Sequence, residues 1–464
     1  MLGRTRHVHF VGIGGIGMSG IAELLLNLGY DVSGSDAKRS DMTDRLARMG
    51  VRMGIGHEAA NVGDADVLVV SSAIPATNPE VAHARLRHVP VIPRAEMLAE
   101  LMRLRFGIAI AGAHGKTTTT SMIALALERA GLDPTAVIGG RLSAFGSNAR
   151  LGSGDYMVAE ADESDRSFLK LSPSIAVITN IDREHMEAYG TFDRLVEAFV
   201  DFADRVPFYG AVVACADDAP VAAMLPRLTR RIITYGFSVP ADVRGLSPAS
   251  DGRSARCNVH YAIRGVPGGS GEGELKIGVP GIHNLQNALA AVAVGLELGV
   301  PFGRLAQALA GFTGAERRYE IRGSVGGVTV VDDYGHHPTE IAAVLRAARS
   351  GDPARIIAVF QPHRYTRTRD LMGEFGPALG LADVVVLTDI YAAGESPIPG
   401  ATVNALAEAM RTHVRDLQVV PLLADVPAHV SALVREGDLV LTLGAGSIGG
   451  TGDRILGELE RKAS

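Results

Sequence analysis

The chain has 464 residues, which is too long for one hydrophobic core and points to two to four domains. Hydrophobic residues make up 47% and charged residues 21%, a balance typical of globular proteins, and the formal net charge of -6 gives no basic field for nucleic acid. Two cysteines without metal-ligand spacing, a charged N-terminus and the absence of an apolar run of roughly 20 residues indicate a cytoplasmic protein without disulfides, signal peptide or membrane helix.

Short β-branched runs alternate with helical periodicity, which predicts an α/β protein with mostly parallel sheets. The first predicted module has a strand at residues 7–13, a glycine-rich turn and a helix at residues 18–28. Two more strands are expected at residues 67–70 and 89–92. We place the first domain at residues 1–105.

A second module is expected at residues 106–314, where a loop separates a strand from a long helix. Its strands are predicted at residues 107–111, 156–159, 175–179 and 211–214, with the helix at 118–130. Residues 238–280 are rich in glycine, serine and proline, so we expect antiparallel strands appended to the parallel sheet. The helix that follows Asn284 is rich in alanine.

The third predicted module spans residues 315–464. Its strands are expected at residues 328–331, 356–360, 384–387 and 439–443, with helices between them. The chain should therefore form three successive α/β domains.

The first glycine-rich turn reads Gly-Ile-Gly-Gly-Ile-Gly from Gly12 to Gly17 and matches the pattern G-x-G-x-x-G. Asp36 ends the next strand-like run, near the spacing expected for an acid that binds a ribose. Taken alone, the turn indicates a dinucleotide such as NAD, and a plain tight turn is the alternative. No histidine can be tied to hydride transfer from the sequence.

A second loop, from Gly112 to Thr118, lies between a predicted strand and a predicted helix. Its glycines let backbone N–H groups converge on phosphate oxygens, while Lys116 can reach the outer phosphates and the Thr117 hydroxyl can bind Mg²⁺. Ile110 stands where the usual phosphate-loop pattern has glycine. The alternative is a glycine-rich turn with a surface lysine, but the strand–loop–helix context favours phosphate binding.

Acidic residues follow two neighbouring strands of the second module. Glu160, Asp162, Glu163 and Asp165 come after one strand, and Asn180, Asp182, Glu184 and His185 come after the next. Parallel strands end at the same edge of a sheet, where oxygen ligands suit Mg²⁺. A solvated acidic loop and a structural His185 are the alternatives.

Histidines and arginines follow two strands of the third module. One run contains Asp332, Asp333, Tyr334 and His336, and the other contains His363, Arg364 and Arg367. Such a combination can bind a carboxylate or a phosphoryl group. Structural ion pairs between the aspartates and nearby arginines are an equally good explanation.

Together these motifs resemble the Mur ligase family, and the resemblance covers almost the whole chain in order. It rests on residues 12–19, 71–74, 112–120, 160–165 with Ser167 and Phe168, 179–181 with His185, 281–284, 287–288, 332–340, 361–370 and 444–446. In two places the chain departs from the family pattern: Ala113 replaces a usual threonine, and Arg166 stands where a small residue is common. Neither change removes a phosphate or metal ligand.

The resemblance implies a Rossmann-like UDP-binding domain, a central P-loop-type ATPase sheet and a C-terminal Rossmann-like domain that binds an amino acid. The chain most resembles those members of the family that join L-alanine to the carboxylate of UDP-N-acetylmuramate. These members act through an acyl phosphate, in peptidoglycan precursor synthesis. The implied partners are thus UDP-N-acetylmuramate, L-alanine and ATP, with Mg²⁺ as the metal.

The resemblance also implies roles for individual residues. The UDP-sugar would contact Gly12, Gly14, Gly15, Gly17, Met18, Ser19, Asp36, Ser71 and Ser72. ATP would contact Gly112, Ala113, His114, Gly115, Lys116, Thr117, Thr118, His283, Asn284 and Asn287. Mg²⁺ would be bound by Thr117, Glu160 and His185, and L-alanine by Tyr334, His336, Arg364 and Arg367. Lys116, Thr117, Glu160, His185 and Arg318 are the implied catalytic residues, although Arg317 could replace Arg318.

Three other functions remain to be weighed. A related ligase that recycles a murein tripeptide would use the same chemistry, but Glu163-Ser164-Asp165 and Asp333-Tyr334-Gly335 look more like the alanine-adding members. An NAD-dependent oxidoreductase would explain the first turn but not Lys116 and Thr117 beside acidic strand ends. A non-catalytic sensor of UDP-muropeptides would need the loop or the metal ligands to have been lost.

Overall fold

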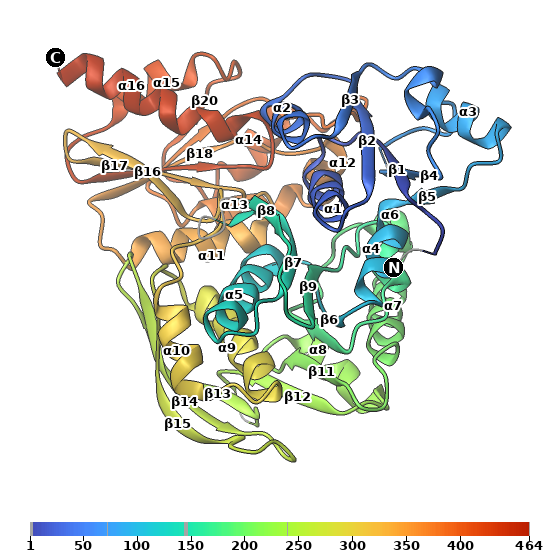
Figure 1. Ribbon diagram of the computed structural model, residues 1–464. Helices are drawn as coiled ribbons and strands as arrows, with labels where there is room; N and C mark the ends of the chain where they lie inside the picture. Colours follow the sequence, from blue (N-terminus) through green and yellow to red (C-terminus); the bar gives the residue numbers. More distant parts are fainter. Residues whose placement is uncertain (1–2, 72, 143–146, 239, 464) are drawn as a thin grey trace. The chain divides into compact units, whose positions relative to one another are not determined.

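The computed structural model describes residues 3–71, 73–142, 147–238 and 240–463 (Figure 1). Within these ranges the strands form three sheets in which most neighbouring strands are parallel, which confirms the expected α/β architecture. The chain divides into two compact units. The first comprises Met1–Leu246, Asn258–Leu275 and Gln286–Phe312, and the second comprises Ser247–Cys257, Lys276–Leu285 and Thr313–Ser464.

The first sheet of the first unit is parallel throughout, in the order β3-β2-β1-β4-β5. Its central strand is wholly buried, as expected for a strand covered on both faces. The strands are β1 (His7–Val11), β2 (Asp31–Asp36), β3 (Arg52–Ile55), β4 (Val67–Val70) and β5 (Val91–Pro93). The helices are α1 (Ile16–Asn27), α2 (Asp41–Arg48), the 3₁₀ helix η1 (Ala59–Val62), α3 (Pro79–Leu86) and α4 (Arg94–Met102).

The second sheet has the order β15-β14-β13-β12-β11-β10-β6-β9-β7-β8. Its strands are β6 (Phe106–Ala111), β7 (Thr135–Leu142), β8 (Ser147–Arg150), β9 (Tyr156–Glu160), β10 (Ile175–Ile178), β11 (Ala211–Cys215), β12 (Ile232–Gly236), β13 (Val243–Ser250), β14 (Ala255–Ala262) and β15 (Ser270–Ile277). The helices are α5 (Lys116–Arg129), η2 (Ser167–Lys170), α6 (Met186–Tyr189), α7 (Phe192–Asp204), α8 (Ala219–Met224), η3 (Leu225–Arg227), α9 (Ile282–Glu297) and α10 (Phe302–Ala310).

Strand β6 lies between β9 and β10, and all three run parallel. Ile110 of β6 is in register with Glu160 at the end of β9, and Ala111 is in register with Ile178 at the end of β10. The loop after β6, the acidic run after β9 and Thr179 therefore start at the same edge of the sheet.

The expectation for residues 238–280 needs one correction. Strands are present there, but β13 joins the sheet by pairing in parallel with β12, through Tyr235 with Val243 and Gly236 with Arg244. Only the last two residues of β12 take part, so a connection of six residues suffices for this short parallel contact.

The sheet of the second unit has the order β16-β17-β21-β18-β19-β20, in which only β16 with β17 is an antiparallel pair among the neighbours in the described ranges. The strands are β16 (Glu320–Val325), β17 (Val328–Asp333), β18 (Arg355–Phe360), β19 (Val384–Leu387), β20 (Leu417–Val419) and β21 (Asp438–Leu443). The helices are α11 (Pro338–Arg349), α12 (Tyr365–Asp370), α13 (Met372–Leu379), α14 (Val403–Met410), α15 (Val426–Leu433), η4 (Ser447–Gly450) and α16 (Thr451–Ala463).

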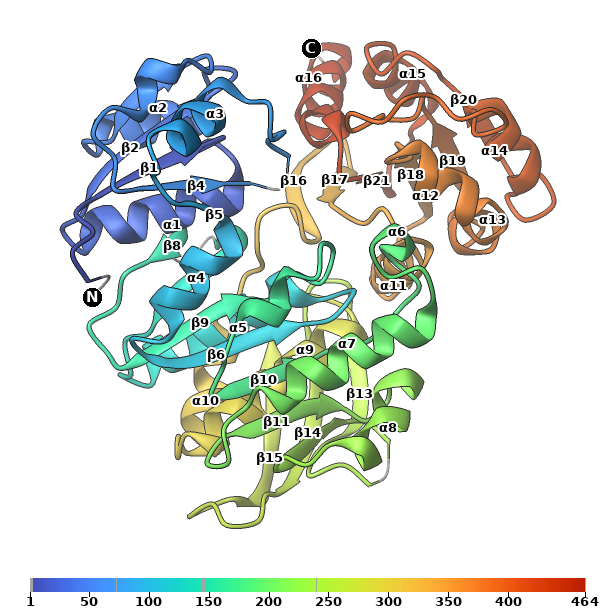
Figure 2. The same ribbon diagram turned by 90° about the vertical axis from the view of Figure 1, so that its right-hand side faces the viewer.

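Two apolar clusters cover the two faces of this sheet. One joins alternate strand residues to Ile341 of α11 and Phe375 of α13, and the other joins the intervening strand residues to Val430 of α15 and Ile455 of α16. Figure 2 shows α15 and α16 side by side. Helices on both faces of a mainly parallel sheet explain why its strands read as continuous apolar runs in the sequence.

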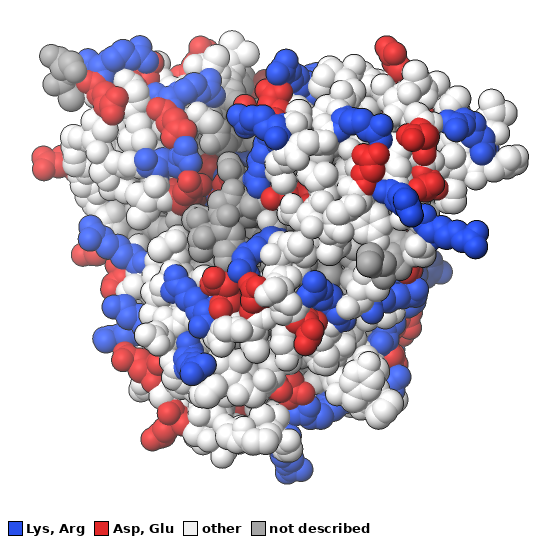
Figure 3. All heavy atoms as spheres, in the orientation of Figure 1, with Lys and Arg blue, Asp and Glu red and all other residues white. Residues whose placement is uncertain are grey.

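Basic and acidic side chains are interspersed on the face drawn in Figure 3, in keeping with the small net charge. In the part of the chain that the structure describes, no helix combines the length and the apolar character needed to cross a bilayer.

Candidate active site

The glycine-rich turn after β1 brings several predicted UDP-sugar residues together. The Asp36 carboxylate, at the end of β2, accepts a hydrogen bond of 2.9 Å from the Gly14 N–H. A Cβ atom on Gly14 would lie 2.8 Å from Asp36 Oδ2, so a larger residue there would push the carboxylate away from this position. Gly12 has a φ of 78°, and Ser71 and Ile74 lie beside it. Asp36 is thus positioned by the turn itself.

The other predicted residues of this turn differ in exposure. Gly15 caps α1, Gly17 lies in its first turn, and Met18 and Ser19 are buried. Ser72 lies outside the described residues.

The predicted phosphate loop is shaped by side chains that follow β10. Asn180 Oδ1 accepts from the His114 N–H at 2.8 Å, while Asn180 Nδ2 and the Thr179 hydroxyl donate to the His114 carbonyl at 2.9 and 2.7 Å.

Gly115 caps α5 with a φ of 81°, and a Cβ there would lie 2.7 Å from Asn287 Oδ1. Ala113 N–H donates to the Asn180 carbonyl, and the Thr117 and Thr118 side chains are buried.

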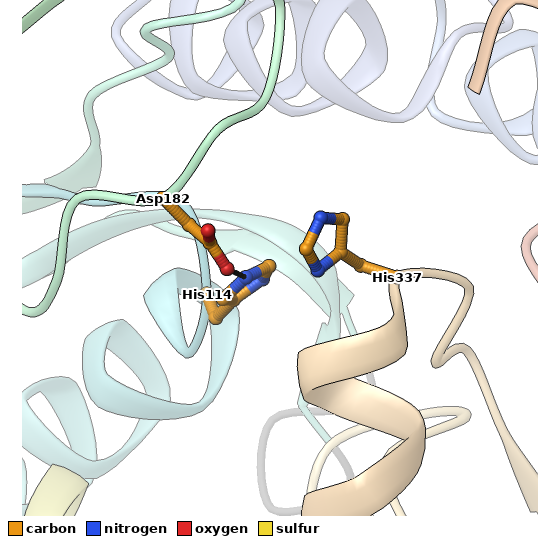
Figure 4. A group of neighbouring side chains, drawn as sticks. All are labelled: His114, Asp182 and His337. Carbon is orange, nitrogen blue, oxygen red and sulfur yellow. Dashed lines mark hydrogen bonds and ion pairs between the residues drawn. The ribbon is translucent and has the colours of Figure 1, made fainter. Parts of the chain in front are cut away.

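His114 projects from this loop toward Asp182, and its Nε2 lies 2.9 Å from Asp182 Oδ2 (Figure 4). Asp182 was expected at this sheet edge from the sequence, but His114 was not expected to contact it. His337, also labelled in Figure 4, belongs to the second unit, where its Nδ1 accepts from the Thr339 N–H at the start of α11.

Lys116 makes an ion pair with Glu163. Its Nζ lies 2.7 Å from Glu163 Oε1 and donates to the Gly112 carbonyl at 2.5 Å. Burial opposes the charge of Lys116, but the Glu163 and Asp162 carboxylates outweigh it and raise its pKa. Burial raises the pKa of Glu163 to about 7, although Lys116 opposes the shift. Glu163 Oε2 is buried without a hydrogen-bond partner among the described residues, so this oxygen has its lone pairs available to a cation.

The two predicted metal-binding residues beyond the loop follow β9 and β10, the strands on either side of β6. Glu160 Oε1 accepts from the Gly139 N–H at 2.6 Å. His185 caps α6 with a φ of 57°, and its Nε2 lies 3.9 Å from both Glu163 Oε1 and Glu184 Oε2. The structure therefore places His185 close to Glu163, a carboxylate that the predicted set of site residues lacked.

A cavity of about 330 Å³ connects the two glycine-rich segments of the first unit. Lys116, Glu160 and Asp162 line it together with residues from the first sheet's loops and helices, namely Gly15, Gly17, Met18, Ser71, Arg94 and Leu98. Val137, Ile138 and Gly139 of β7 complete the lining. The turn expected to hold a UDP-sugar and the lysine expected to contact ATP thus share one cavity of the size usual for ligand sites.

Of the predicted ATP contacts beyond the loop, Asn287 lies against Gly115 in the first unit. His283 and Asn284 lie in the first turn of α9 and belong to the second unit. Asn284 Nδ2 donates to the Pro280 carbonyl at 2.7 Å, and burial, with a contribution from Arg318, lowers the pKa of His283 to about 4.

The predicted amino-acid residues gather in the second unit. The His336 ring lies 5.4 Å from the Tyr334 ring and 5.6 Å from the His363 ring. Arg367 Nη1 lies 3.2 Å from His363 Nδ1, and Arg364 caps α12 with Nη1 4.0 Å from Glu395 Oε1. Burial and the neighbouring cations lower the pKa of His363 to about 3, so this ring is neutral among the arginines.

Arg317 and Arg318 both lie over the Tyr334 ring but differ in their other contacts. The Arg317 guanidinium donates to Asp332 Oδ2 at 2.8 Å and to the Gly444 carbonyl at 2.6 Å. Arg318 lies 3.8 Å from Glu340. The tight contacts of Arg317 leave Arg318 as the arginine better able to reorient toward a ligand.

Two side chains of the site were missed from the sequence. Glu163 belongs to an acidic run that was recognised, but only the path of the chain after β9 shows which carboxylate meets Lys116. Arg94, at the start of α4, lies in no motif that marks it as a cavity residue.

Comparison with known families and proteins extends these observations to the whole chain. Residues 7–106 match the "Mur ligase family, catalytic domain", residues 110–295 the "Mur ligase middle domain", and residues 317–446 the "Mur ligase, glutamate ligase domain". The chain is 54% identical to a UDP-N-acetylmuramate--L-alanine ligase from Pelobacter propionicus, over 99% of this chain and 100% of the relative.

Two solved structures are similar over nearly the full length. The UDP-N-acetylmuramate-alanine ligase from Thermotoga maritima has a TM-score of 0.83 at 30% identity, covering 98% of this chain and 99% of that one. A murein peptide ligase from Psychrobacter arcticus has a TM-score of 0.72 at 25% identity, covering 98% of both chains. These matches show that the chain belongs to the Mur ligase family.

Proposed function

We propose that the chain joins L-alanine to the carboxylate of UDP-N-acetylmuramate while ATP is converted to ADP and phosphate. It is an acid–amino-acid ligase of peptidoglycan precursor synthesis, and we place the reaction in the cytoplasm. The main structural support is the shared cavity, because it brings Lys116 of the phosphate loop to the same space as Gly15 and Gly17 of the first turn.

The chemistry explains why two anion-binding segments must meet. A carboxylate is a poor acyl donor, so it first attacks the γ-phosphate of ATP, and it becomes an acyl phosphate as the bond to ADP breaks and ADP leaves. The amine of L-alanine then attacks the acyl carbon, and phosphate leaves. The first step joins two anions, so a cation such as Lys116 has to offset the charge in the transition state.

We assign the remaining steps of recognition to separate parts of the chain. The turn from Gly12 to Gly17 and Asp36 bind the UDP group, and the loop from Gly112 to Thr118 binds the ATP phosphates. Tyr334 and His336, with Arg364 and Arg367, form the alanine site, in which the arginines pair with the free carboxylate. Arg318, rather than Arg317, supplies the additional cation for the phosphates.

The donor set at the sheet edge fits Mg²⁺. Carboxylate, hydroxyl and imidazole groups follow three adjacent strands, and Glu163 Oε2 is a buried oxygen without a hydrogen-bond partner in the described part of the chain. We propose that Thr117, Glu160 and His185 hold the metal. A bound Mg²⁺ would neutralise charge on the β- and γ-phosphates.

A phosphate-release assay with UDP-N-acetylmuramate, ATP and Mg²⁺ tests this function. L-Alanine should support turnover far better than the murein tripeptide or other amino acids. Release that depended on the tripeptide and not on L-alanine would assign the chain to the recycling reaction instead.

Calorimetry separates the ligase from an oxidoreductase. UDP and NAD both present a diphosphate and a ribose to the first turn, so glycine spacing cannot distinguish them. Tight binding of NADH together with no detectable heat from UDP-N-acetylmuramate would contradict the assignment of this turn.

A further inference from the structure

Arg94 brings a cation into the shared cavity from outside both glycine-rich segments. It is the first residue of α4, follows β5 directly, and its side chain is 25% exposed. The lining of the cavity otherwise carries charge only on Lys116, Glu160 and Asp162 among the described residues. Lys116 already pairs with Glu163. Arg94 is the other cation of the lining, and it lies beside Gly17 of the first turn.

The Arg94 guanidinium extends toward Gly17. A Cβ atom built on Gly17 would lie 2.5 Å from Arg94 Nη1 and 3.1 Å from its Cζ. Any larger residue at this position would displace the guanidinium, so the glycine keeps room for it. An anion bound at the turn that contains Gly15 and Gly17 would therefore lie within reach of Arg94.

The other arm of Arg94 makes a loose ion pair with Asp162. Arg94 Nη2 lies 3.3 Å from Asp162 Oδ2, which is longer than the roughly 2.7–2.9 Å of a strong charge-assisted hydrogen bond. Both side chains are partly exposed, at 25% and 40%, so the pair is easily exchanged for a stronger partner. Asp162 Oδ1 accepts from the Ser164 N–H, which keeps this carboxylate in place if the arginine moves away.

We propose that Arg94 is a further binding residue for the UDP-sugar, that it binds the diphosphate, and that Asp162 holds it at the cavity until this anion arrives. The inference rests on the proposed function, because it requires the first turn to bind a UDP group. A guanidinium offers two parallel N–H donors to phosphate oxygens, which makes the exchange from carboxylate to phosphate favourable.

Calorimetry with UDP, UDP-N-acetylmuramate and uridine tests the contact. Arg94→Ala should weaken both UDP and UDP-N-acetylmuramate by about 10- to 100-fold, because a hydrogen bond to a charged group is lost, and leave uridine unchanged. Arg94→Lys should restore part of the affinity as a point charge without the paired donors. Arg103→Ala is the matched control, because Arg103 caps the same helix at its other end and pairs with Glu100 on the surface.

The holding role of Asp162 is tested by a substitution that should improve binding. Asp162→Asn keeps the acceptor for Ser164 but removes the charge, so UDP should bind about two- to fivefold more tightly than to the unsubstituted protein. In the Arg94→Ala background the same change should have no effect. An equal gain in both backgrounds would mean that Asp162 only repels the ligand, and this part of the proposal would fail.

The outcomes separate this inference from the proposed function. If the unsubstituted protein bound neither UDP nor UDP-N-acetylmuramate, the function itself would be wrong. If it bound both and Arg94→Ala bound them equally well with an unchanged melting temperature, Arg94 would be excluded as a ligand contact. A loss confined to UDP-N-acetylmuramate would assign Arg94 to the sugar-linked carboxylate and overturn the diphosphate contact.

Discussion

Lys116 of the proposed phosphate loop forms an ion pair with Glu163, with Nζ 2.7 Å from a carboxylate oxygen of this almost wholly buried side chain. The same lysine donates to the Gly112 carbonyl, so its side chain lies folded over its own loop. Removing Lys116 leaves the buried Glu163 carboxylate without this ion pair, and removing Glu163 leaves the half-buried Lys116 ammonium without its closest carboxylate. Lys116 is therefore the cation that the loop offers to the ATP phosphates, and Glu163 is the counter-ion of this cation.

Lys116→Ala should reduce phosphate release by roughly 10² to 10³, because the cation that offsets transferring charge is lost. It should also lower the melting temperature, since Glu163 would lose its partner. In Lys116→Ala with Glu163→Gln, stability should recover and activity should not. Lys170→Ala, which removes a surface partner of Glu96, is the control. Near-normal turnover by Lys116→Ala would refute the phosphate-loop role.

His185→Ala should raise the Mg²⁺ concentration needed for half-maximal activity more than it raises KM for L-alanine. The reason is the proposed role of His185 as a metal ligand beside Glu163, and the measurement is a magnesium titration at saturating substrates. His88→Ala is a matched control, because His88 is an exposed histidine with the same positive φ of 57°. An unchanged magnesium midpoint in the His185 variant would count against a metal role.

Arg364→Ala and Arg367→Ala should each raise KM for L-alanine strongly and change UDP-sugar affinity little. Both follow His363 after β18, where the free carboxylate of the amino acid needs a cationic partner. Steady-state kinetics and calorimetry measure the two effects. The control is Arg369→Ala, because Arg369 lies in the same helix but pairs with Asp370 on the surface. Lost UDP-sugar affinity would place the two arginines in a different site.

Asp333 should make the stability of the second unit depend on pH. Burial raises the pKa of Asp333 to about 6, although Arg318 and the N–H groups of Gly335 and Tyr319 oppose the shift. The folded chain then holds this proton more tightly than the unfolded chain, so stability falls as pH rises from about 4 to 6, by about 3 kcal/mol. Asp333→Asn should remove this part of the pH dependence.

Melting temperatures measured between pH 4 and pH 7 check the Asp333 prediction. The difference between variant and unsubstituted protein should shift in favour of the variant as pH rises. The same substitution at the exposed Asp389 serves as the control. A difference that stayed constant with pH would contradict the raised pKa.

The sequence predicted the buried strands well because their apolar runs are continuous. The strands expected at residues 67–70 and 384–387 are present with those bounds, as β4 and β19. The strands β7 and β12 were not predicted although they contain buried residues, and neither was β16 at the edge of its sheet, whose residues are all exposed or half-buried. Helix α1 begins at Ile16, two residues before the expected start, because Gly15 serves as its cap.

In the candidate site, too, features formed by adjacent residues could be predicted, whereas contacts between distant segments could not. The loop after β6 could be predicted because glycines and Lys116 are adjacent in the sequence. The contacts that shape it could not, since Asn180 and Asn287 reach it from distant segments. Arg94 meets Asp162 only because α4 packs near η2, a contact that no local pattern encodes.

Product analysis tests directly whether the chain joins L-alanine to the UDP-sugar. The protein is incubated with UDP-N-acetylmuramate, ATP, Mg²⁺ and isotope-labelled L-alanine, and the nucleotide products are examined by mass spectrometry. We predict a UDP-sugar that carries one labelled alanine in amide linkage, formed in equal amounts with ADP and phosphate. Conversion of ATP without transfer of the label to the UDP-sugar, or no reaction at all, would show that the chain does not catalyse this ligation.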